Sequence, residues 1–582
     1  MSAARLATAL AAATLVAFAG FARGPLGAHE KHHVLVLAAL GALALGQAGG
    51  LLVRGLGGRG ELRLGASALG VLAAASGLVR EPPSLGAATA TLLALALATG
   101  LELRDAGASL FRLLASERAH RVVIGLAALG FFALALAEQL YRYENLQIGV
   151  LDQGIFTQPL WSILNGHGPY STVAARNPGH NHLFSDHFYV GIYLHAPLYA
   201  LWPDPRILCW IQSATMALAG VQTYRLGRTL RLASAPALAV GLAFLAHPSV
   251  WSGATGYAVY GYHMDALFPL MFLGAAEILI RERTSRAAAL AAGVAPRASA
   301  ATVLLVGTIV LVALFCHERF ALVWCGLGAA LVLRGERRAG FALGTLAGFW
   351  FALAALVVIP HYLGLQAWFF TFVPGRARVG PPWSETIGRA ARYVALLTLS
   401  FGGVAWRSSY LVAAAPMFLG YVVAYSGGYG PPLELLSVHA LTIFAALTLA
   451  TLDGLVRVAA RSEKRARGLA GLVLAASLVS GAEVTRPLVT APLSPERRAA
   501  FAECLAAIPA DASVSTTNFV GTRLTHRVKL YHFPDLQDAH FVVVDERQQW
   551  DLTPRARETV AELRAKAKVV FDREGFVLFE RP

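Results

Sequence analysis

The residues of this chain that could do chemistry lie in the segments that connect long apolar runs. Three segments hold most of them, namely 141–187, 252–265 and 361–392, and a very short fourth one surrounds Glu318. The candidates include Asp152, Gln158, Asp186, His187, His263, Asp265, Glu318, Arg376, Arg378 and Arg389. Carboxylates and imidazoles serve as general acids and bases and as ligands of divalent ions, and arginines bind phosphate. The residue types therefore predict acid–base chemistry or the binding of a phosphorylated ligand.

Asp152 opens a short amphipathic segment, 152–164. Its apolar residues Ile155, Phe156, Leu160, Ile163 and Leu164 share roughly one helical face, and the segment is too short to span a bilayer. We expect this helix to lie on the membrane surface and to hold Asp152 at the level of a lipid phosphate. Two interpretations of Asp152 stay open. It is a general base, or it only caps a helix that begins with Gln153, because Asp is a favoured N-cap residue.

The pair Asp186–His187 follows two further histidines, His180 and His182. Carboxylate and imidazole are ligands for divalent ions, so the pair predicts a metal or phosphate site. The alternative is a solvated loop with incidental histidines, because the spacing matches no established metal-binding motif.

Glu318 stands between two apolar runs and is flanked by His317 and Arg319. A carboxylate at the bilayer centre costs roughly 2.5–3.5 kcal/mol, and less at the edge, so it needs a partner. We expect it either to contact a ligand or to pair with Arg319 or a neighbouring histidine. His263 and Asp265 lie at the mouth of an apolar run and are either functional or anchors at the membrane interface.

The composition indicates which elements must position these residues. The chain has 582 residues, of which 56% are hydrophobic and only 14% are charged, and its mean hydropathy is +0.56. This excludes an ordinary water-soluble enzyme and a disordered chain, and it predicts an all-α polytopic membrane protein. The net charge of +15 comes from arginines in short loops, which is a topology signal and not a nucleic-acid footprint. The four cysteines are far apart and predict no disulfide framework.

We expect about fifteen transmembrane helices. The predicted spans are 5–22, 33–54, 64–80, 86–103, 121–140, 207–228, 235–251, 264–281, 300–316, 319–333, 339–360, 392–406, 409–425, 436–457 and 467–483. Six short loops rich in arginine fall on one side of this series, which the positive-inside rule makes cytoplasmic. This holds if the apolar segment 188–202 is a re-entrant or interfacial helix. Residues 1–22 are a first span or, alternatively, a signal peptide.

The chain divides into three parts by this pattern. Residues 1–115 form an N-terminal extension of about four spans, and residues 116–483 form a membrane core with a large external loop, 141–187. Residues 484–582 alternate short strand patterns with helical ones and predict a small α/β domain. The same topology places this domain outside the cytoplasm, and the protein in the inner (plasma) membrane as a multi-pass protein.

Six ordered blocks carry a resemblance to a known family. They begin with LDQGIFTQPLWSILNGHG, SDHFYVGIYLHAPLYALWPDP, YHMDALFPLMFLGAAEIL and CHERFALVWCGLGAALVL, and end with IPADASVSTTNFVGTRLTHRVKLYHFP and AHFVVVD. From about residue 121 to the C-terminus the chain resembles the bacterial and archaeal membrane proteins of domain of unknown function 2079. That family in turn is similar to integral-membrane glycosyltransferases of the type C fold.

The resemblance implies transfer of a sugar from a polyprenyl-phosphate donor to a glycan, lipid or protein acceptor outside the cytoplasm. It implies that Asp152 is the catalytic base, that Gln158, His187, His263, Glu318, Arg376, Arg378 and Arg389 bind substrate or phosphate, and that Asp186 and His187 are metal ligands, for Mg²⁺ or Mn²⁺. The chain departs from the family pattern at Thr157, where relatives tend to carry an acid, and at His317–Arg319, where they tend to read Lys-Glu-Asp. A paired-carboxylate metal site is less well supported for that reason.

The alternative from another class is a non-catalytic transporter, flippase or envelope-assembly protein that binds a lipid-linked glycan. No Gly- or Pro-interrupted span recurs at equivalent positions in two halves, and no acidic residue lies at mid-span, as coupled transport usually requires. These features favour the enzyme.

Overall fold

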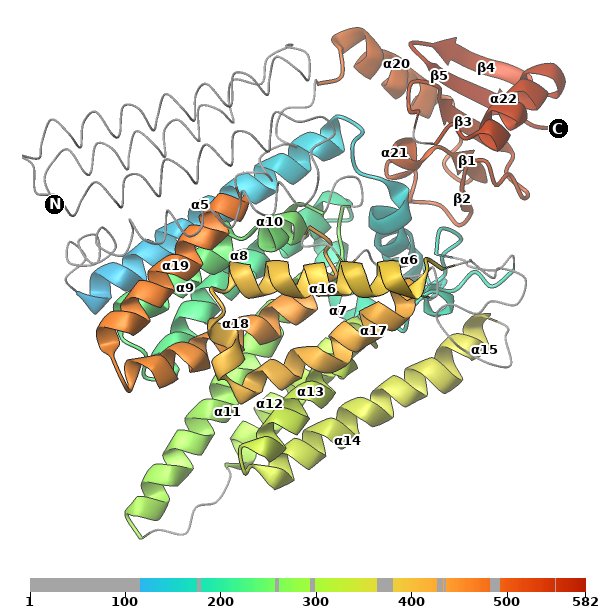
Figure 1. Ribbon diagram of the computed structural model, residues 1–582. Helices are drawn as coiled ribbons and strands as arrows, with labels where there is room; N and C mark the ends of the chain where they lie inside the picture. Colours follow the sequence, from blue (N-terminus) through green and yellow to red (C-terminus); the bar gives the residue numbers. More distant parts are fainter. Residues whose placement is uncertain are drawn as a thin grey trace, which may run out of the picture.

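The structure is a computed structural model that describes residues 116–174, 179–256, 261–293, 299–363, 380–426, 433, 436–481, 492–549 and 551–582. The four predicted spans between residues 5 and 103 lie outside the described residues. The described part has a helical bundle and, at one end of it, a small C-terminal domain with a sheet (Figure 1).

The bundle follows the predicted order of apolar segments. Apart from two short helices between α5 and α8, its α-helices are α5 (Glu117–Glu144), α8 (Arg206–Thr229), α9 (Ser234–Ala246), α10 (Pro248–Thr255), α11 (Phe268–Ala291), α12 (Ala300–Cys316), α13 (Phe320–Leu333), α14 (Arg337–Leu353), α15 (Ile359–Leu363), α16 (Trp383–Ser400), α17 (Ala415–Ser426), α18 (Ala440–Ala459) and α19 (Glu463–Gly481). Short π-helical and 3₁₀ segments connect several of them, namely η2 (Leu183–Ser185), η3 (Met264–Leu267), η4 (Ala354–Val358), η5 (Val404–Arg407) and η6 (Ser409–Ala414).

Within the described ranges, four helical stretches are long and apolar enough to cross a membrane: Glu117–Glu144, Arg337–Leu363, Ser409–Ser426 and Ala440–Ala459. A fifth is the pair α9 and α10, which is bent by 49°. The bend lies at His247–Pro248, because proline has no backbone N–H to continue the helix. The predicted total of about fifteen spans stays a prediction.

Two segments between α5 and α8 form short helices. Segment 188–202 contains α7 (Ile192–Leu201), which at 10 residues is too short to span a bilayer. Residues 150–164 form a π-helical turn, η1 (Val150–Gly154), and then α6 (Ile155–Leu164). Protein covers much of this second helix, and its expected position on the membrane surface stays a prediction. Phe156 and Leu160 are buried, and so are Thr157 and Gln158 on the other side, because α7 and the C-terminal domain cover the helix.

The C-terminal α/β domain forms as its strand and helix patterns predict. It contains α20 (Pro495–Ala506), β1 (Val514–Thr516), α21 (Asn518–Gly521), β2 (Leu530–His532), β3 (Phe541–Asp545), α22 (Pro554–Lys566), β4 (Lys568–Arg573) and β5 (Phe576–Glu580). The strand order is β2-β1-β3-β5-β4. Strand β1 is parallel to β2 and β3, whereas β5 is antiparallel to β3 and β4. The central strands β1 and β3 are buried along their whole length.

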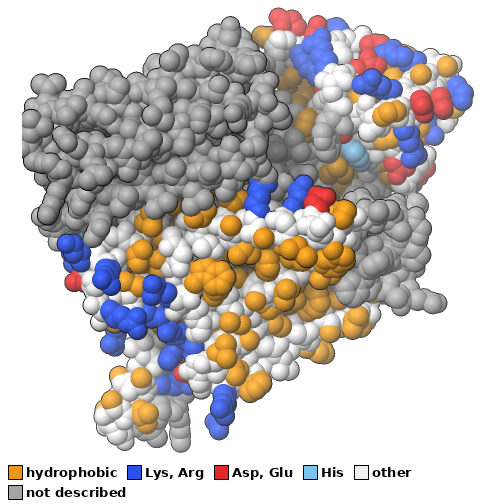
Figure 2. All heavy atoms as spheres, in the orientation of Figure 1, with side chains coloured by type: hydrophobic (Ala, Val, Ile, Leu, Met, Phe, Trp, Pro, Cys, Tyr) orange, Lys and Arg blue, Asp and Glu red, His pale blue; other side chains and the backbone are white. Residues whose placement is uncertain are grey.

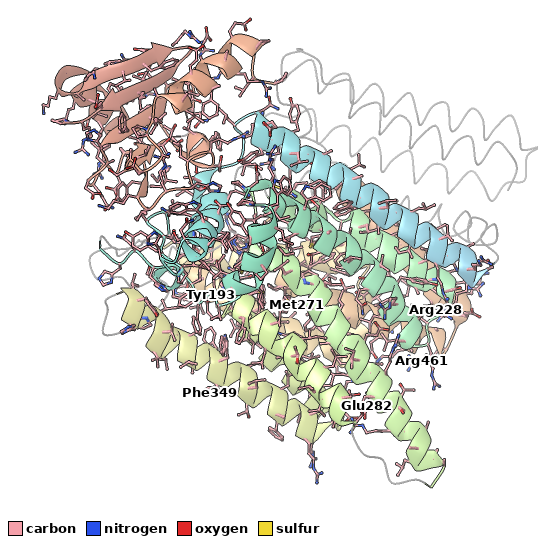
Figure 3. The ribbon with its side chains drawn as sticks, turned by 180° about the vertical axis from the view of Figure 1, so that it is seen from behind. Tyr193, Arg228, Met271, Glu282, Phe349 and Arg461 are labelled. Atoms are coloured by element: carbon pink, nitrogen blue, oxygen red, sulfur yellow. The ribbon has the colours of Figure 1, made fainter. Side chains whose placement is uncertain are left out.

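Arginine-rich loops gather at the end of the bundle that lies away from the C-terminal domain. Arg228 pairs with Glu117 at 2.9 Å, and Arg286 pairs with Glu336 at 3.4 Å, which brings the ends of different helices together. Figure 3 shows Arg228 and Arg461 at this end. Figure 2 shows Lys and Arg side chains clustered there and hydrophobic side chains exposed over α14, α16 and α17. The bundle therefore has one basic end and one end that carries the C-terminal domain.

Candidate functional site

Glu318 lies in the connection between α12 and α13 and is fully buried. His187 Nδ1 lies 2.7 Å from Glu318 Oε1, and the backbone N–H of Phe188 donates to Oε2 at 3.1 Å. His317 Nδ1 is 3.2 Å from the same Oε2. Asp186 adds a second carboxylate, 3.9 Å from His187 Nε2. Of the expected partners, the histidines and not Arg319 hold the Glu318 carboxylate.

This arrangement sets the protonation of the group. Burial works to raise the pKa of Glu318, but His317, His187 and their hydrogen bonds lower it, so that the pKa lies well below its usual value. Burial works against a charge on His317 and lowers its pKa. The connection thus holds a buried carboxylate whose ionisation is favoured by the two histidines that contact it.

Asp265 is the centre of a second buried cluster, at the start of η3. His263 Nδ1 contacts Asp265 Oδ2, and Arg319 Nη2 donates to the same oxygen at 2.5 Å. His439, which precedes α18, has Nδ1 3.8 Å from it. The other oxygen, Asp265 Oδ1, has no hydrogen-bond partner among the residues that the structure describes.

The two clusters are neighbours because Glu318 and Arg319 are consecutive in the chain and turn to different partners. Aromatic rings join them. Tyr189 packs edge-on against His187 and His317, with ring centroids 5.2 and 5.1 Å away, and against Phe156 of α6 at 5.0 Å. Phe156 in turn lies 6.4 Å from His263. Four segments that are far apart in the sequence therefore meet in one polar site with aromatic walls.

Asp152 lies in the turn η1 and is half-buried. The capping hypothesis is wrong, because Gly149 is the N-cap of this turn and α6 begins only at Ile155. The next residue connects the turn to the second cluster. Gln153 is fully buried, its Nε2 donates to Pro205 O at 2.7 Å, and its Oε1 accepts from Tyr262 N at 2.8 Å, directly before His263.

Gln158 is fully buried, and both ends of its side-chain amide form hydrogen bonds within the protein. Its Oε1 accepts from Ser171 Oγ at 3.0 Å and from Thr172 N at 2.9 Å. Its Nε2 donates to the carbonyl oxygens of Arg527 and Val528. The amide thus joins α6, residues 171–172 and the C-terminal domain. Its predicted contact with substrate stays a prediction.

The remaining candidates lie elsewhere or outside the described part. His180 Nδ1 lies 3.0 Å from Tyr362 O, and His182 stacks on the Tyr362 ring at 4.0 Å, so both face α15 and not the Glu318 cluster. Arg389 on α16 lies 3.6 Å from Glu385 and 5.3 Å from the Tyr425 ring. Arg376 and Arg378 lie outside the described residues.

Sequence reasoning missed three members of the site: Arg319 as the partner of Asp265, His439, and Gln153. A buried arginine between two apolar runs is a signal of its own, because such a charge needs a carboxylate. His439 carries no comparable signal, since a lone histidine beside Ser437 and Val438 resembles any loop residue.

Two groups of side chains have the donor types of a metal site. The ligand atoms of His187, His317 and Glu318 lie within 4.8 Å of one another, and so do those of His263, Asp265 and His439. His317 Nε2 is buried without a hydrogen-bond partner among the described residues, whereas Nδ1, the ring nitrogen near Glu318, accepts from the backbone N–H of Arg319 at 3.4 Å. In the second group Arg319 already neutralises Asp265. The first group therefore fits a divalent ion better than the second.

The comparisons with known proteins agree with a multi-pass membrane protein. No curated protein matches the chain. The structure of ArnT from Cupriavidus metallidurans in the apo state is similar at 12% identity and a TM-score of 0.44, and ArnT bound to undecaprenyl phosphate at 13% and 0.45. Each match covers 78% of this chain and 97% of ArnT. Residues 142–369, which include Asp152 and both buried clusters except His439, match the model of the DUF2079 family of predicted membrane proteins, and this confirms the predicted resemblance over those residues.

Proposed function

We propose that this protein is an integral-membrane glycosyltransferase that moves a sugar from a polyprenyl-phosphate-linked donor to an extracytoplasmic acceptor. The observation that carries the proposal is the pair of fully buried carboxylates, Asp265 and Glu318, held by Arg319 and by histidines at one end of the bundle. Buried ionised groups are costly within a membrane protein and usually mark a functional site. The turn that carries Asp152 adjoins them through Gln153 and Tyr262.

In the proposed reaction Asp152 acts as the general base. Its carboxylate takes the proton of an acceptor hydroxyl, and the hydroxyl oxygen forms a bond to the anomeric carbon of the sugar. The bond between that carbon and the phosphate oxygen breaks, and the lipid phosphate leaves with the electron pair. A half-buried carboxylate suits this role, because the base must reach a bound hydroxyl and still be shielded from bulk water.

Hydrogen-bond donors and cations around the two clusters would bind the phosphate of the lipid-linked sugar. His187, whose side chain is 19% exposed, and His263 offer imidazole groups, and Arg376, Arg378 and Arg389 of the third loop would add positive charge. Glu318 orients His187 through the 2.7 Å contact and so positions the donor group.

A divalent ion fits the group formed by His187, His317 and Glu318, with Asp186 beside it. When bound there it would neutralise charge on the leaving phosphate. Two imidazoles and a carboxylate suit Zn²⁺ or Mn²⁺ better than Mg²⁺, which prefers oxygen ligands.

Elemental analysis tests this metal site. After the purified protein is incubated with Zn²⁺ or Mn²⁺ and then dialysed, we expect it to retain about one ion per chain. His317→Ala should lose that ion, whereas His180→Ala, on the Tyr362 side, should keep it; equal metal content in both variants would contradict the site.

The proposed orientation follows from the basic end of the bundle. Arginine-rich loops face the cytoplasm in membrane proteins, which would put the polar site and the C-terminal domain on the outer side of the inner membrane. A lipid-linked donor in the outer leaflet would then approach the site from between the helices.

The test is a transfer assay. Purified protein in vesicles that contain undecaprenyl-phosphate donors with mass-tagged sugars should release lipid phosphate and pass the tag to added glycan, lipid or protein acceptors. Binding of the donors without release of any tagged sugar, across hexose and pentose donors, would contradict the enzyme and favour the binding or transport function.

A further inference from the structure

The turn that carries Asp152 is built partly from the C-terminal domain. Leu146 and Val150 are buried in the hydrophobic core of that domain, among residues such as Val514, Val520 and Phe541. A Cβ atom on Gly521 of α21 would lie 2.7 Å from Val150 Cβ. Helix α21 therefore packs so closely against the turn η1 that no side chain fits at Gly521. Two residues before Asp152, the chain is therefore part of the folded domain.

Asn518 makes the most direct contact. Its Oδ1 accepts from the backbone N–H of Leu151 at 3.1 Å, and Asn518 is itself fully buried. Asp551 fixes Asn518, because its Oδ2 accepts from the Asn518 backbone N–H at 2.6 Å. A Cβ atom on Gly149 would lie 2.7 Å from Asn518 Cγ, so a side chain at Gly149 would push the two segments apart.

The other side of the turn belongs to the membrane core. Gln153 bonds with Pro205 O and Tyr262 N, as described above. Asp152 thus lies between Leu151, which bonds to the C-terminal domain, and Gln153, which bonds to the bundle. Its position depends on how these two bodies meet.

We propose that the C-terminal domain is an integral part of the site and that Asn518 is a positioning residue that sets the location of the Asp152 carboxylate. The proposal rests on the proposed role of Asp152 as the base. It goes beyond that role, because it makes an α/β domain distant in sequence necessary for the rate of the reaction.

Contacts other than those of Asn518 also join the domain to the membrane core, which makes the proposal testable. Arg523 donates to Tyr143 O at 2.8 Å and stacks on the Tyr143 ring at 3.7 Å. Tyr199 Oη lies 2.7 Å from His526 Nε2. Thr172 exchanges hydrogen bonds with the backbone of Leu530 at 2.6 and 2.8 Å. These contacts remain in an Asn518 variant, so the full chain should still fold and assemble.

The kinetic test uses Asn518→Ala in the full-length protein with undecaprenyl-phosphate sugar donors. A displacement of about 1 Å costs up to about 10²-fold in rate, so kcat should fall about 10- to 100-fold while the KM for the donor and the melting temperature stay close to wild type. The pH dependence of kcat/KM should shift as well, because the surroundings of the base change. Wild-type kcat and pH profile in Asn518→Ala, together with an inactive Asp152→Asn, would overturn the positioning role and leave the proposed function standing.

A second test does not need activity. Hydrogen exchange of the amide of Leu151, followed by mass spectrometry on peptides that cover 146–156, should be slow in the wild type and at least 10-fold faster in Asn518→Ala. Gly149→Ala should also speed the exchange of the Leu151 amide. In the double variant Gly149→Ala/Asn518→Ala, part of the effect of Gly149→Ala should disappear, because the Asn518 side chain that meets the new Cβ atom is no longer there. Gly130→Ala on α5, where a Cβ atom meets nothing within 4 Å, is the matched control and should leave it unchanged. Unchanged exchange in both Asn518→Ala and Gly149→Ala would overturn the inference, whatever the outcome of the transfer assay.

Discussion

At the scale of single residues, the site is built around two consecutive charged residues, Glu318 and Arg319, that bind different partners. Glu318 turns to His187 and His317, whereas Arg319 turns to Asp265, which lies 54 residues away in the chain. Both carboxylates are fully buried, so each needs its partner to stay ionised. Two buried carboxylates therefore lie in neighbouring clusters, and the guanidinium of Arg319 pairs with Asp265 and not with Glu318.

The Asp265–Arg319 pair predicts an asymmetric effect on stability. Asp265→Asn leaves Arg319 buried without a counter-charge, which should cost about 3–5 kcal/mol in the free energy of unfolding, measured by denaturant titration in mixed micelles. Adding Arg319→Met should recover much of that loss, because no unpaired charge remains. Glu385→Gln, which breaks the exposed pair with Arg389, is the control and should cost less than about 1 kcal/mol. Equal losses in the single and double variants would contradict the pairing.

The sequence was sufficient to locate these residues but not to pair them. A carboxylate between two apolar runs must be satisfied, and this alone singles out Glu318. Which group satisfies it depends on tertiary contacts with His187, and the nearest cation in sequence, Arg319, points to Asp265 instead. His439 joins the site only because α18 packs near η3, and no local pattern predicts that packing.

At the scale of elements, α13 and α14 hold the Glu318 connection in place by close packing through glycine. These antiparallel neighbours approach until a Cβ atom on Gly340 would lie 2.7 Å from Val332 Cγ2 and 2.9 Å from Val332 N. Small residues allow membrane helices to pack with their backbones in contact. The contact fixes α13, whose first turn follows Glu318 and Arg319.

Gly340→Ala should therefore disturb the pair of helices. We expect a loss of about 1–3 kcal/mol in stability from overpacking, measured as a lower midpoint of unfolding in detergent. Gly344→Ala, one turn further along the same helix, meets nothing within 4 Å and should be neutral or stabilise the helix by up to about 1 kcal/mol. If the two substitutions lower the midpoint equally, the close contact is not present.

Elements whose signal is local were predicted well, and their contacts with distant parts of the chain were not. The strand patterns at 540–545 and 576–580 agree with β3 and β5 to within a residue, because an apolar run between turn residues marks each of them. Helix α6 was expected on the membrane surface from the same kind of pattern. The structure adds what that pattern does not predict: Thr172 and the carbonyl groups of Arg527 and Val528 cover the polar side of α6 from 14 and about 370 residues away.

At the scale of the whole molecule, charge is distributed along one axis. Arg228 and Arg461 lie at the end of the bundle away from the C-terminal domain (Figure 3). The polar site adjoins the turn η1, which packs into the core of that domain. Between the two ends, hydrophobic side chains such as Leu129, Leu304, Phe341, Leu356 and Leu419 are exposed, as expected of surfaces that face lipid. A basic end, an apolar belt and a folded domain at the opposite end together predict the orientation in the membrane.

Cysteine labelling in intact spheroplasts measures this orientation. With the native cysteines replaced, a membrane-impermeant maleimide should label Gln549→Cys on the C-terminal domain without lysis. Lys464→Cys, in the exposed first turn of α19 at the basic end, should react only after permeabilisation. The reverse pattern would place the C-terminal domain in the cytoplasm and remove the lipid-linked donor of the outer leaflet from consideration.

The central claim is that Asp152 is the base of a sugar-transfer reaction, and the substitution Asp152→Asn tests it most directly. Asparagine has nearly the same shape, so the turn η1 should keep its conformation and the melting temperature in detergent should stay at the wild-type value. Loss of the proton acceptor should lower the rate of transfer from an undecaprenyl-phosphate donor by about 10²- to 10⁴-fold. Transfer at the wild-type rate by a variant of wild-type stability would contradict the account, because the reaction would then proceed without this carboxylate.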